Sequence, residues 1–243
     1  MSKIHFGVFK VKKWAVNLCL VLILGMIAGG ALVAGFSVIP TSVVSGVYYN
    51  GDKNSNNVTL MINVYWGTEY LDEMLSIFEE KNVKTTFFVG GTWAVLNENY
   101  LTKINEAGHE LANHGYHHKD HDKLDEEGNL NEIKTTHKIV KELLDIDMTL
   151  FAPPSGAYDK TTVSCASQLG YKTIMWTRDT IDWRDHDANL IYSRAIKNAC
   201  GGDLILMHPT EATVEALPRI IDYFQSNNFN LTTVSENIGT ISA

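Results

Sequence analysis

Apolar and polar positions alternate along most of the chain in two different periods. Short runs rich in Val, Ile, Leu and Phe predict β-strands. Apolar residues at intervals of three and four positions predict helices with one buried face. The strands are predicted at residues 58–62, 84–89, 109–113, around 151, 171–176, 203–207 and 230–234. The helices are predicted at residues 70–81, 101–107, 131–144, 161–169, 188–198 and 215–226.

Strands and helices follow one another about seven times in this pattern. Such alternation indicates parallel strands joined by helices, because the crossover between parallel strands is usually a helix. The chain could close into a (β/α) barrel or form an open, doubly wound sheet, and the pattern alone does not separate the two. In both arrangements the residues that follow the strands meet at one edge of the sheet.

The N-terminal segment has a different composition from the rest. Residues 1–13 carry a cluster of lysines, whereas residues 15–36 contain no charged side chain. As a helix, the uncharged stretch is roughly 33 Å long, close to the ~30 Å hydrocarbon core of a membrane. We expect residues 14–36 to form a transmembrane signal anchor that leaves the following chain outside the cytoplasm. A cleaved signal peptide is the alternative.

A polar segment separates this expected anchor from the folded part of the chain. Residues 37–57 include a run of Gly, Asp, Asn and Ser with little to bury, which is typical of a linker. We therefore expect the folded domain to comprise residues 58–243.

The balance of charges argues against a nucleic-acid partner. The chain has 28 acidic and 20 basic side chains, a formal net charge of -8, whereas nucleic-acid binding needs a basic surface. No glycine-rich phosphate loop follows the first predicted strand, so a nucleotide is not expected either. Cys165 and Cys200 could form a disulfide outside the cytoplasm, although a single pair is weak evidence for one.

Histidines gather directly after the strand predicted at residues 109–113. Four of them lie within nine residues, and His114 and His118 are four positions apart. A helical turn in this loop would bring these two imidazoles to one metal ion. The alternative is a solvated loop without a ligand.

Polar residues also follow three later strands. A proline-containing turn at residues 153–158 follows one strand, and Asp179, Asp182 and Trp183 follow the next. His208 follows a further, buried strand. Each could be an ordinary turn or surface residue, but a parallel sheet would place all of them on one rim.

These motifs and their order resemble the polysaccharide deacetylase family, the NodB-homology domain, and in particular its membrane-anchored, sporulation-associated branch. Residues 110–118 resemble the metal-binding second motif of the family, 153–156 the third, 179–183 the fourth and 206–208 the fifth. The resemblance extends from about residue 58 to 234, and several motifs in order are more specific than any one of them.

The resemblance implies a distorted (β/α) barrel of seven or eight strands that removes acetyl groups from amino sugars of cell-wall peptidoglycan. His114 and His118 would bind a divalent metal, which could be zinc, cobalt or manganese. His208 would be the general acid of the hydrolysis, oriented by Asp179 or Asp182. The residues expected to line the substrate groove are Trp66, Pro154, Ser155, Gly156, Tyr158, Trp183 and Leu206.

The first motif departs from the form that the family usually has. Asn63 stands where the resemblance expects the general base, and Val64 stands where it expects a metal-binding carboxylate. Ala152 replaces the arginine that braces this base in the family. The replacements at positions 63 and 152 are consistent with each other, because a buried arginine would have no partner once the carboxylate at position 63 is absent. Glu69 could substitute as base only if it reaches the site.

Three functions remain open from the sequence. The family resemblance favours a metal-assisted N-deacetylase, a hydrolase of non-peptide carbon–nitrogen bonds. The altered first motif favours a non-catalytic relative that binds glycan at the cell or spore envelope. A membrane-tethered domain that binds a partner without a glycan site is the third.

Overall fold

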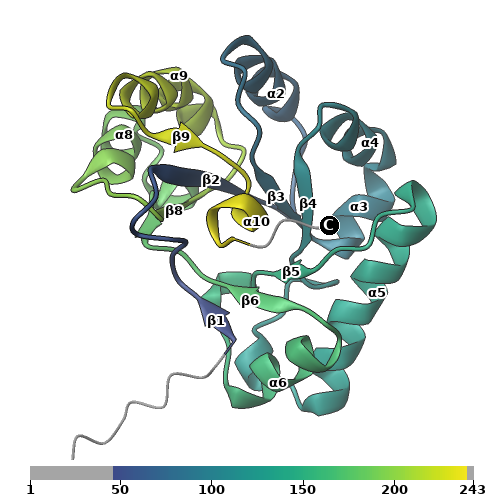
Figure 1. Ribbon diagram of the computed structural model, residues 1–243. Coiled ribbons are helices and arrows are strands. Elements are labelled where there is room, and N and C mark those ends of the chain that lie inside the picture. The colour runs from purple at the N-terminus through teal and green to yellow at the C-terminus, as the bar shows by residue number, and fades with distance from the viewer. Residues whose placement is uncertain (1–45, 240–243) are drawn as a thin grey trace, which may run out of the picture. The chain divides into compact units, whose positions relative to one another are not determined.

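One parallel sheet organises the residues that the computed structural model describes, 46–239 (Figure 1). Neighbouring strands follow the order β1-β6-β5-β4-β3-β2-β8-β7, and β9 pairs with the start of β2. All of these pairs are parallel. The strands are β1 (Val47–Tyr48), β2 (Asn57–Val64), β3 (Thr86–Val89), β4 (Glu110–Asn113), β5 (Leu150–Phe151), β6 (Lys172–Ile174), β7 (Arg178–Asp179), β8 (Leu204–Met207) and β9 (Asn230–Leu231).

Helices surround this sheet in the connections between its strands (Figure 1). The helix predicted from residue 131 begins at Glu126, because the Asp125 side chain caps it by accepting a hydrogen bond from the Gly128 N–H at 2.8 Å. The helices are α2 (Leu71–Glu80), α3 (Gly91–Leu96), α4 (Glu98–Glu106), α5 (Glu126–Leu144), α6 (Lys160–Gln168), α7 (Asp182–Asp185), α8 (Ala188–Ile196), α9 (Glu211–Ser226) and α10 (Val234–Asn237), with 3-10 turns η1 (His121–Lys123) and η2 (Pro154–Gly156).

The sheet is curled, and the chain itself bridges its two ends. β1 and β6 form one end of the hydrogen-bonded path, and β7 forms the other. Residues 175–177 connect β6 directly to β7. Met175 N–H donates to the Tyr48 carbonyl at 2.8 Å, and Thr177 N–H donates to the Leu204 carbonyl at 2.9 Å. The predicted distorted barrel of seven or eight strands fits this eight-strand path, and the open alternative fits it less well.

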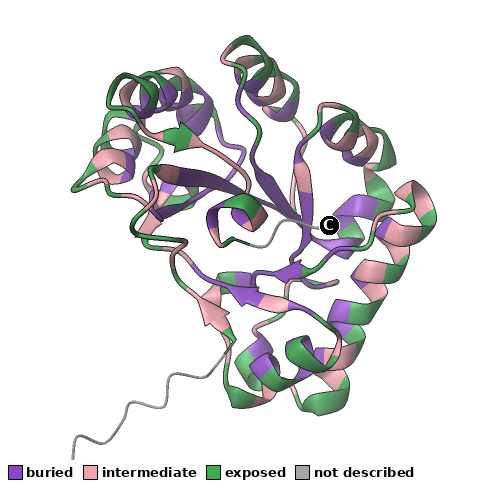
Figure 2. Ribbon diagram, viewed as in Figure 1, coloured by how far each residue is buried: buried purple, intermediate pink, exposed green. Residues whose placement is uncertain are grey.

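The two faces of the sheet form separate hydrophobic clusters. The outer cluster lies between strands and helices and includes Ile62 and Val64. Figure 2 shows that helices are buried mainly on the side that faces the strands. Successive side chains of a strand point to opposite faces, so Met61 and Asn63 point inward while Ile62 and Val64 point outward. The inner cluster consists of Met61, Phe88, Ala112, Leu150, Ala152, Ile174, Leu204 and Val234.

Helix α10 covers the amino-terminal ends of the central strands. The Val234 N–H donates to Thr86 Oγ1 at 2.8 Å. The Asn237 side chain donates to Thr59 Oγ1 at 3.1 Å. These bonds close one end of the inner cluster and leave the carboxyl-terminal ends of the strands for a site.

The structure leaves one expectation about the rest of the chain untested and modifies another. The predicted flank 1–13, the anchor 14–36 and residues 37–45 lie outside the described residues, and none of the described helices is long and apolar enough to cross a membrane. The remainder of the predicted linker is not a free connection. Val47–Tyr48 pairs with β6, and the Gly51 N–H donates to the Gly202 carbonyl at 2.7 Å. These pairings satisfy the backbone of a segment whose side chains alone suggested a linker.

The disulfide that the sequence left open between Cys165 and Cys200 is not formed. Cys165 is buried with a free thiol, and Cys200 is exposed with a free thiol.

We expect the stability of the fold to fall at acidic pH because of His109. Its ring is buried against the edges of Phe78 and Phe87, and Nδ1 accepts the Thr85 N–H at 3.2 Å. Burial, with a smaller effect of Lys84, lowers the pKa of His109 to about 4. The unfolded chain protonates this residue near pH 6.5, so its contribution is present above that pH and is lost between about 6.5 and 4.

His109→Asn keeps an acceptor for the Thr85 N–H and removes the titration. Between pH 7 and 4, wild type should therefore lose as much as about 3 kcal/mol more unfolding free energy than the variant. Urea denaturation at both pH values measures the difference. Equal losses in the two proteins would contradict this role of His109.

Candidate functional site

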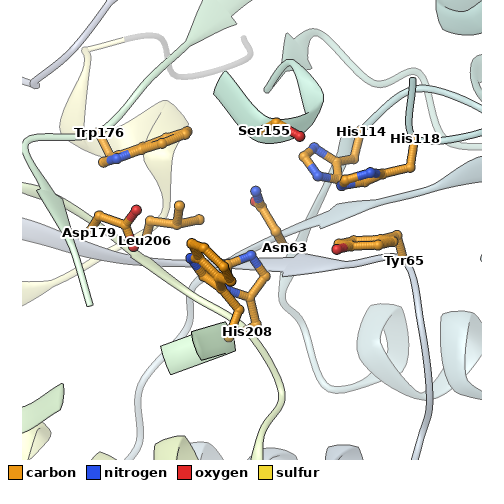
Figure 3. A pocket seen from close by; sticks show the side chains of 10 residues that line it. Asn63, Tyr65, His114, His118, Ser155, Trp176, Asp179, Leu206 and His208 are labelled. Carbon is orange, nitrogen blue, oxygen red and sulfur yellow. The ribbon is translucent and has the colours of Figure 1, made fainter. Parts of the chain in front are cut away.

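A cavity of about 290 Å³ opens where the carboxyl-terminal ends of the strands meet. Figure 3 shows Asn63 in its middle, between a wall that carries His114 and His118 and a wall that carries Asp179. The residues that line the cavity are Asn63, Tyr65, His114, His118, Ser155, Trp176, Asp179, Trp183, Leu206 and His208.

Most of the residues predicted for a site are brought together in this lining, but a second group lies behind it. Val64, Trp66 and Asp182 are not in the lining. The other predicted groove residues outside the lining are Pro154, Gly156 and Tyr158. Within this second group, Trp66 and Asp182 contact His208, and Gly156 packs against Trp176.

Two neutral imidazoles form one wall. The buried His114 has Nδ1 at 2.7 Å from the Ala152 carbonyl, which can only accept, so Nδ1 carries the proton and Nε2 has a free lone pair. The ring of His118 is 5.1 Å from that of His114. Burial lowers the pKa of His118 to about 4 and that of His114 well below its usual range. Both rings are therefore uncharged near neutral pH and suited to bind a cation.

The loop that carries these histidines is held by Glu132 of α5. Its carboxylate accepts the backbone N–H groups of Tyr116 at 2.8 Å and His117 at 2.7 Å. Lys119 contacts the same carboxylate at 3.2 Å. A buried acid thus replaces the regular backbone pairing that the loop lacks.

His208 on the opposite side is fixed by a buried carboxylate. Asp182 accepts from His208 Nδ1 at 2.8 Å and from the His208 backbone N–H at 2.6 Å. It also accepts from Thr213 Oγ1 of α9 at 2.6 Å. The ring of Trp66 stacks on His208 with a centroid distance of 5.3 Å. Asp182 and Trp66, both predicted as site residues, therefore act on His208 from outside the cavity.

Asp179 has a different position from Asp182, although the sequence treats the two as alternatives. Asp179 lines the cavity and accepts the Ile181 N–H at 2.8 Å. Its burial raises the pKa of this carboxyl group. Of these two acids, only Asp182 hydrogen-bonds to His208.

The proline-containing turn supports the wall that Trp176 forms. A Cβ atom at Gly156 would lie 2.9 Å from the Trp176 ring, so this position requires glycine for close packing as well as for its φ of +65°. Pro154 is buried. The Tyr158 hydroxyl contacts the hydroxyl of Tyr49 at the surface.

Two lining residues, Tyr65 and Trp176, were not predicted. The Tyr65 ring stacks on His118 with a centroid distance of 3.4 Å and an interplanar angle of 21°. Trp176 lies in the link between β6 and β7. Trp176 is the last residue of the strand predicted at 171–176, and Tyr65 lies three positions after the strand predicted at 58–62. Their place near the carboxyl ends of these strands was the signal that could have identified them.

The end of β2 presents an amide to the cavity and an alkyl group to the core. Asn63 is 3% exposed and points inward, whereas Val64 is buried in the outer cluster. Ala152 is buried and offers only its carbonyl group, to His114. Glu69 accepts the Thr68 N–H at 2.9 Å and does not line the cavity.

The donor atoms at this site fall one short of a three-ligand metal centre. His114 and His118 offer two nitrogen ligands suited to zinc, cobalt or manganese, but Val64 has no donor atom. Between residues 46 and 239, no cluster of three or more His, Cys, Asp or Glu side chains is arranged to hold an ion. The residues present therefore do not form a complete metal site.

Comparison with known proteins relates both sequence and fold to one family. The sequence profile of the polysaccharide deacetylases matches residues 50–174. The uncharacterized protein YlxY of Bacillus subtilis is 36% identical over 188 residues, which cover 77% of this chain and 59% of YlxY. A peptidoglycan-N-acetylglucosamine deacetylase of Bacillus cereus is 27% identical over 191 residues, which cover 76% of this chain and 70% of the deacetylase. The chain thus spans 59% of the length of YlxY.

Among solved structures, similar folds include BA3943 of Bacillus anthracis, described as a CE4 family pseudoenzyme. It matches with a TM-score of 0.78 and 32% identity, covering 80% of this chain and 69% of BA3943. A mutant of BA3943, described as having restored enzymatic activity, matches with a TM-score of 0.78 and 31% identity, covering 80% of this chain and 71% of the mutant.

We expect Asp182→Asn to destabilise the protein. The carboxylate accepts from donors of His208, Thr213 and Trp183. An amide must turn its NH2 group toward at least one of these donors, which costs about 1–3 kcal/mol of unfolding free energy for each pair lost. Chemical denaturation measures the loss. Asp185→Asn is the control, since that acid pairs with Arg184 and Arg194 near the surface, and its effect should be smaller. Equal effects would contradict a special role of Asp182.

Proposed function

The chain belongs to the polysaccharide deacetylase family, and we propose that it binds acetylated cell-wall glycan in the cavity without hydrolysing it. The single observation that carries this proposal is the end of β2. Asn63 faces the cavity and Val64 is buried in the outer cluster, where the family resemblance expects two carboxylates. The cavity remains formed and keeps polar side chains in its lining, but the two expected carboxylates are absent from positions 63 and 64.

Hydrolysis would require a group that takes a proton from the attacking water. The amide of Asn63 cannot act as this base near neutral pH. Of the lining residues, Asp179 alone carries a carboxylate, and Figure 3 shows it on the wall opposite His114 and His118. Members of the family are generally metal-dependent, and here the third metal ligand is also replaced.

Binding of a sugar requires aromatic surface and a few polar groups but no catalytic base, and the cavity provides these groups. Trp176 and Trp183 present aromatic surface, and Trp183 is 51% exposed at the rim. Aromatic faces combined with a few fixed polar groups are typical of ligand pockets. The apolar faces of sugar rings stack on such surfaces.

The relatives support both parts of the proposal. One similar protein is named as a peptidoglycan-N-acetylglucosamine deacetylase, which favours peptidoglycan as the ligand. BA3943 is described as a pseudoenzyme, and a mutant of it regained enzymatic activity. A loss of activity with preservation of the fold therefore has a precedent among similar chains.

A slow metal-assisted deacetylase is the second candidate. The hydrogen bond between His208 and Asp182 favours it, because this pair could still supply the general acid. The two candidates differ only in whether acetate is released.

The membrane anchor at residues 14–36 remains part of the proposal, with the family domain outside the cytoplasm, where peptidoglycan lies. The association with sporulation rests on the resemblance alone. In protoplasts, which keep an intact membrane after removal of the wall, an externally added protease should degrade the family domain. Protection equal to that of a cytoplasmic marker protein would contradict this placement.

We expect purified wild type to release no acetate from peptidoglycan or N-acetylated oligosaccharides supplied with zinc, cobalt or manganese. Asn63→Asp combined with Val64→Asp and Ala152→Arg should gain metal-dependent release, because it restores the two carboxylates and the arginine that the family resemblance expects. General base catalysis alone contributes about 10²–10⁴-fold. Acetate release over time is the measurement.

The matched control is the same triple variant with His208→Ala, which should lose the gained activity. Release of acetate by wild type as fast as by the triple variant would contradict the non-catalytic proposal and favour the deacetylase. Absence of saturable binding of any acetylated glycan by wild type would sink the binding proposal.

A further inference from the structure

Two apolar side chains protrude at the corner between α3 and α4. Leu96 is 76% exposed and Val95 is 52% exposed, and they are the last two residues of α3. Trp93 and Ala94 are buried on the inner face of this helix, so the two side chains that follow them face outward. Contiguous exposed apolar surface is typical of sites that contact another molecule.

A hollow lies on each side of these two residues. One, of about 190 Å³, lies between Val95 and α5, and the other, of about 630 Å³, extends along α4. α3 packs against both α4 and α5, and Figure 1 shows the three helices as neighbours. No residue of either hollow lines the cavity at the strand ends. The smaller hollow is lined by Val95, Glu98, Ile139, Glu142 and Leu143.

The charged side chains around the hollows are mostly acidic and lack partners. Glu98 and Glu106 form no ion pair or side-chain hydrogen bond with any described residue. Glu142 has a contact of 3.7 Å to a lysine of the same helix, which contributes little between two exposed side chains. Lys103, the one basic side chain among the residues that line the hollows, is paired with Asp72 at 2.6 Å. The surface therefore combines apolar contact with unpaired negative charge.

This combination favours a basic protein segment over other occupants. The glutamates would repel an anionic membrane surface. A second copy of this chain would bring a formal net charge of -8 toward the same surface. In the proposed topology, the lysines of residues 1–13 lie on the other side of the membrane. A basic segment of another protein would supply the missing positive charge.

The form of the surface favours a helix as that segment. Helices form the surface, and their backbone groups are bonded within each helix, so a strand could not add to it through main-chain hydrogen bonds. An amphipathic helix can place apolar side chains at intervals of three and four positions into the hollows beside Leu96. Lysines or arginines next to this apolar face would then meet Glu98 and Glu106.

We propose that the α3–α4 surface, formed by Val95, Leu96, Glu98, Glu106 and Leu143, binds a basic amphipathic helix of another protein. The apolar side chains supply the contact area, and the glutamates select a basic partner and make binding depend on salt. The inference does not depend on glycan binding, because the surface and the cavity share no residue.

The test uses the full chain in nanodiscs of uncharged lipid, with empty nanodiscs as the blank. The probe is a fluorescent helical peptide of about 20 residues, with leucines along one face and lysines beside them. A matched peptide carries glutamates in place of the lysines. Fluorescence anisotropy should show saturable binding of the lysine peptide that weakens as salt is added, and about tenfold weaker binding of the glutamate peptide.

Variants of the surface should change this binding in a defined way. Val95→Ser combined with Leu96→Ser should weaken binding of the lysine peptide by about tenfold, because apolar contact area is lost. Glu98→Gln combined with Glu106→Gln should weaken it several-fold and reduce its salt dependence. The matched control is Leu190→Ser, since this leucine of α8 is 43% exposed but lines neither hollow, and binding should not change. All five side chains are exposed, so melting temperatures close to that of wild type should show that the variants are folded.

Several outcomes would overturn the proposal. These are no binding of the lysine peptide, equal binding of both peptides, and undiminished binding by the variant with serines at positions 95 and 96. A loss of binding in Leu190→Ser as large as in that variant would also contradict it. Binding to nanodiscs of anionic lipid that requires Leu96 would assign the surface to a membrane instead. A dimer in analytical ultracentrifugation that the two serines abolish would assign it to a second copy.

Discussion

The alternation of side chains along β2 is the constraint on which the site depends. Both faces of this central strand are covered, by the inner cluster and by the outer cluster. Consecutive side chains along the strand point to opposite faces of the sheet. Met61 therefore packs inside and Asn63 continues that column into the cavity, while Ile62 and Val64 pack under the helices. The two positions that the family resemblance assigns to carboxylates thus lie in different environments.

This division explains why both replacements are compatible with a stable fold. Valine at position 64 adds apolar contact to a core that would otherwise have to accommodate a carboxylate, whose burial without a cation is costly. Ala152 joins the inner cluster without the charge of an arginine. Without carboxylates at positions 63 and 64, an arginine at position 152 would be a buried charge without a partner, so the three replacements are electrostatically consistent. Of the three replacements, Asn63 is the one that leaves a buried polar atom without a partner among the described residues.

The sequence predicted the elements with strong periodicity and the rim residues that follow them. Residues such as His114, Asp179 and His208 could be placed together because parallel strands end at one edge. It did not predict β1, because a two-residue strand has no period and depends on pairing with β6, distant in the chain. Nor did it separate Asp182 from Asp179, since which acid turns toward His208 depends on Thr213 of α9. Stacking of Tyr65 on His118 is likewise a tertiary contact without a local pattern.

The polar groups of the site do not all argue for function with equal strength. Asp182 links the end of β8 to α9 by accepting hydrogen bonds from His208 and Thr213. Its contribution to stability alone therefore accounts for its bond to His208. The burial of Glu132 is likewise explained by stability, because its carboxylate holds the loop at Tyr116 and His117. An intact acid–histidine pair is therefore weak evidence for catalysis. Asn63 has no such account, because its unpaired oxygen lowers stability and nothing within the described residues uses it. The amide at the centre of the cavity is therefore the polar group whose presence packing alone does not explain.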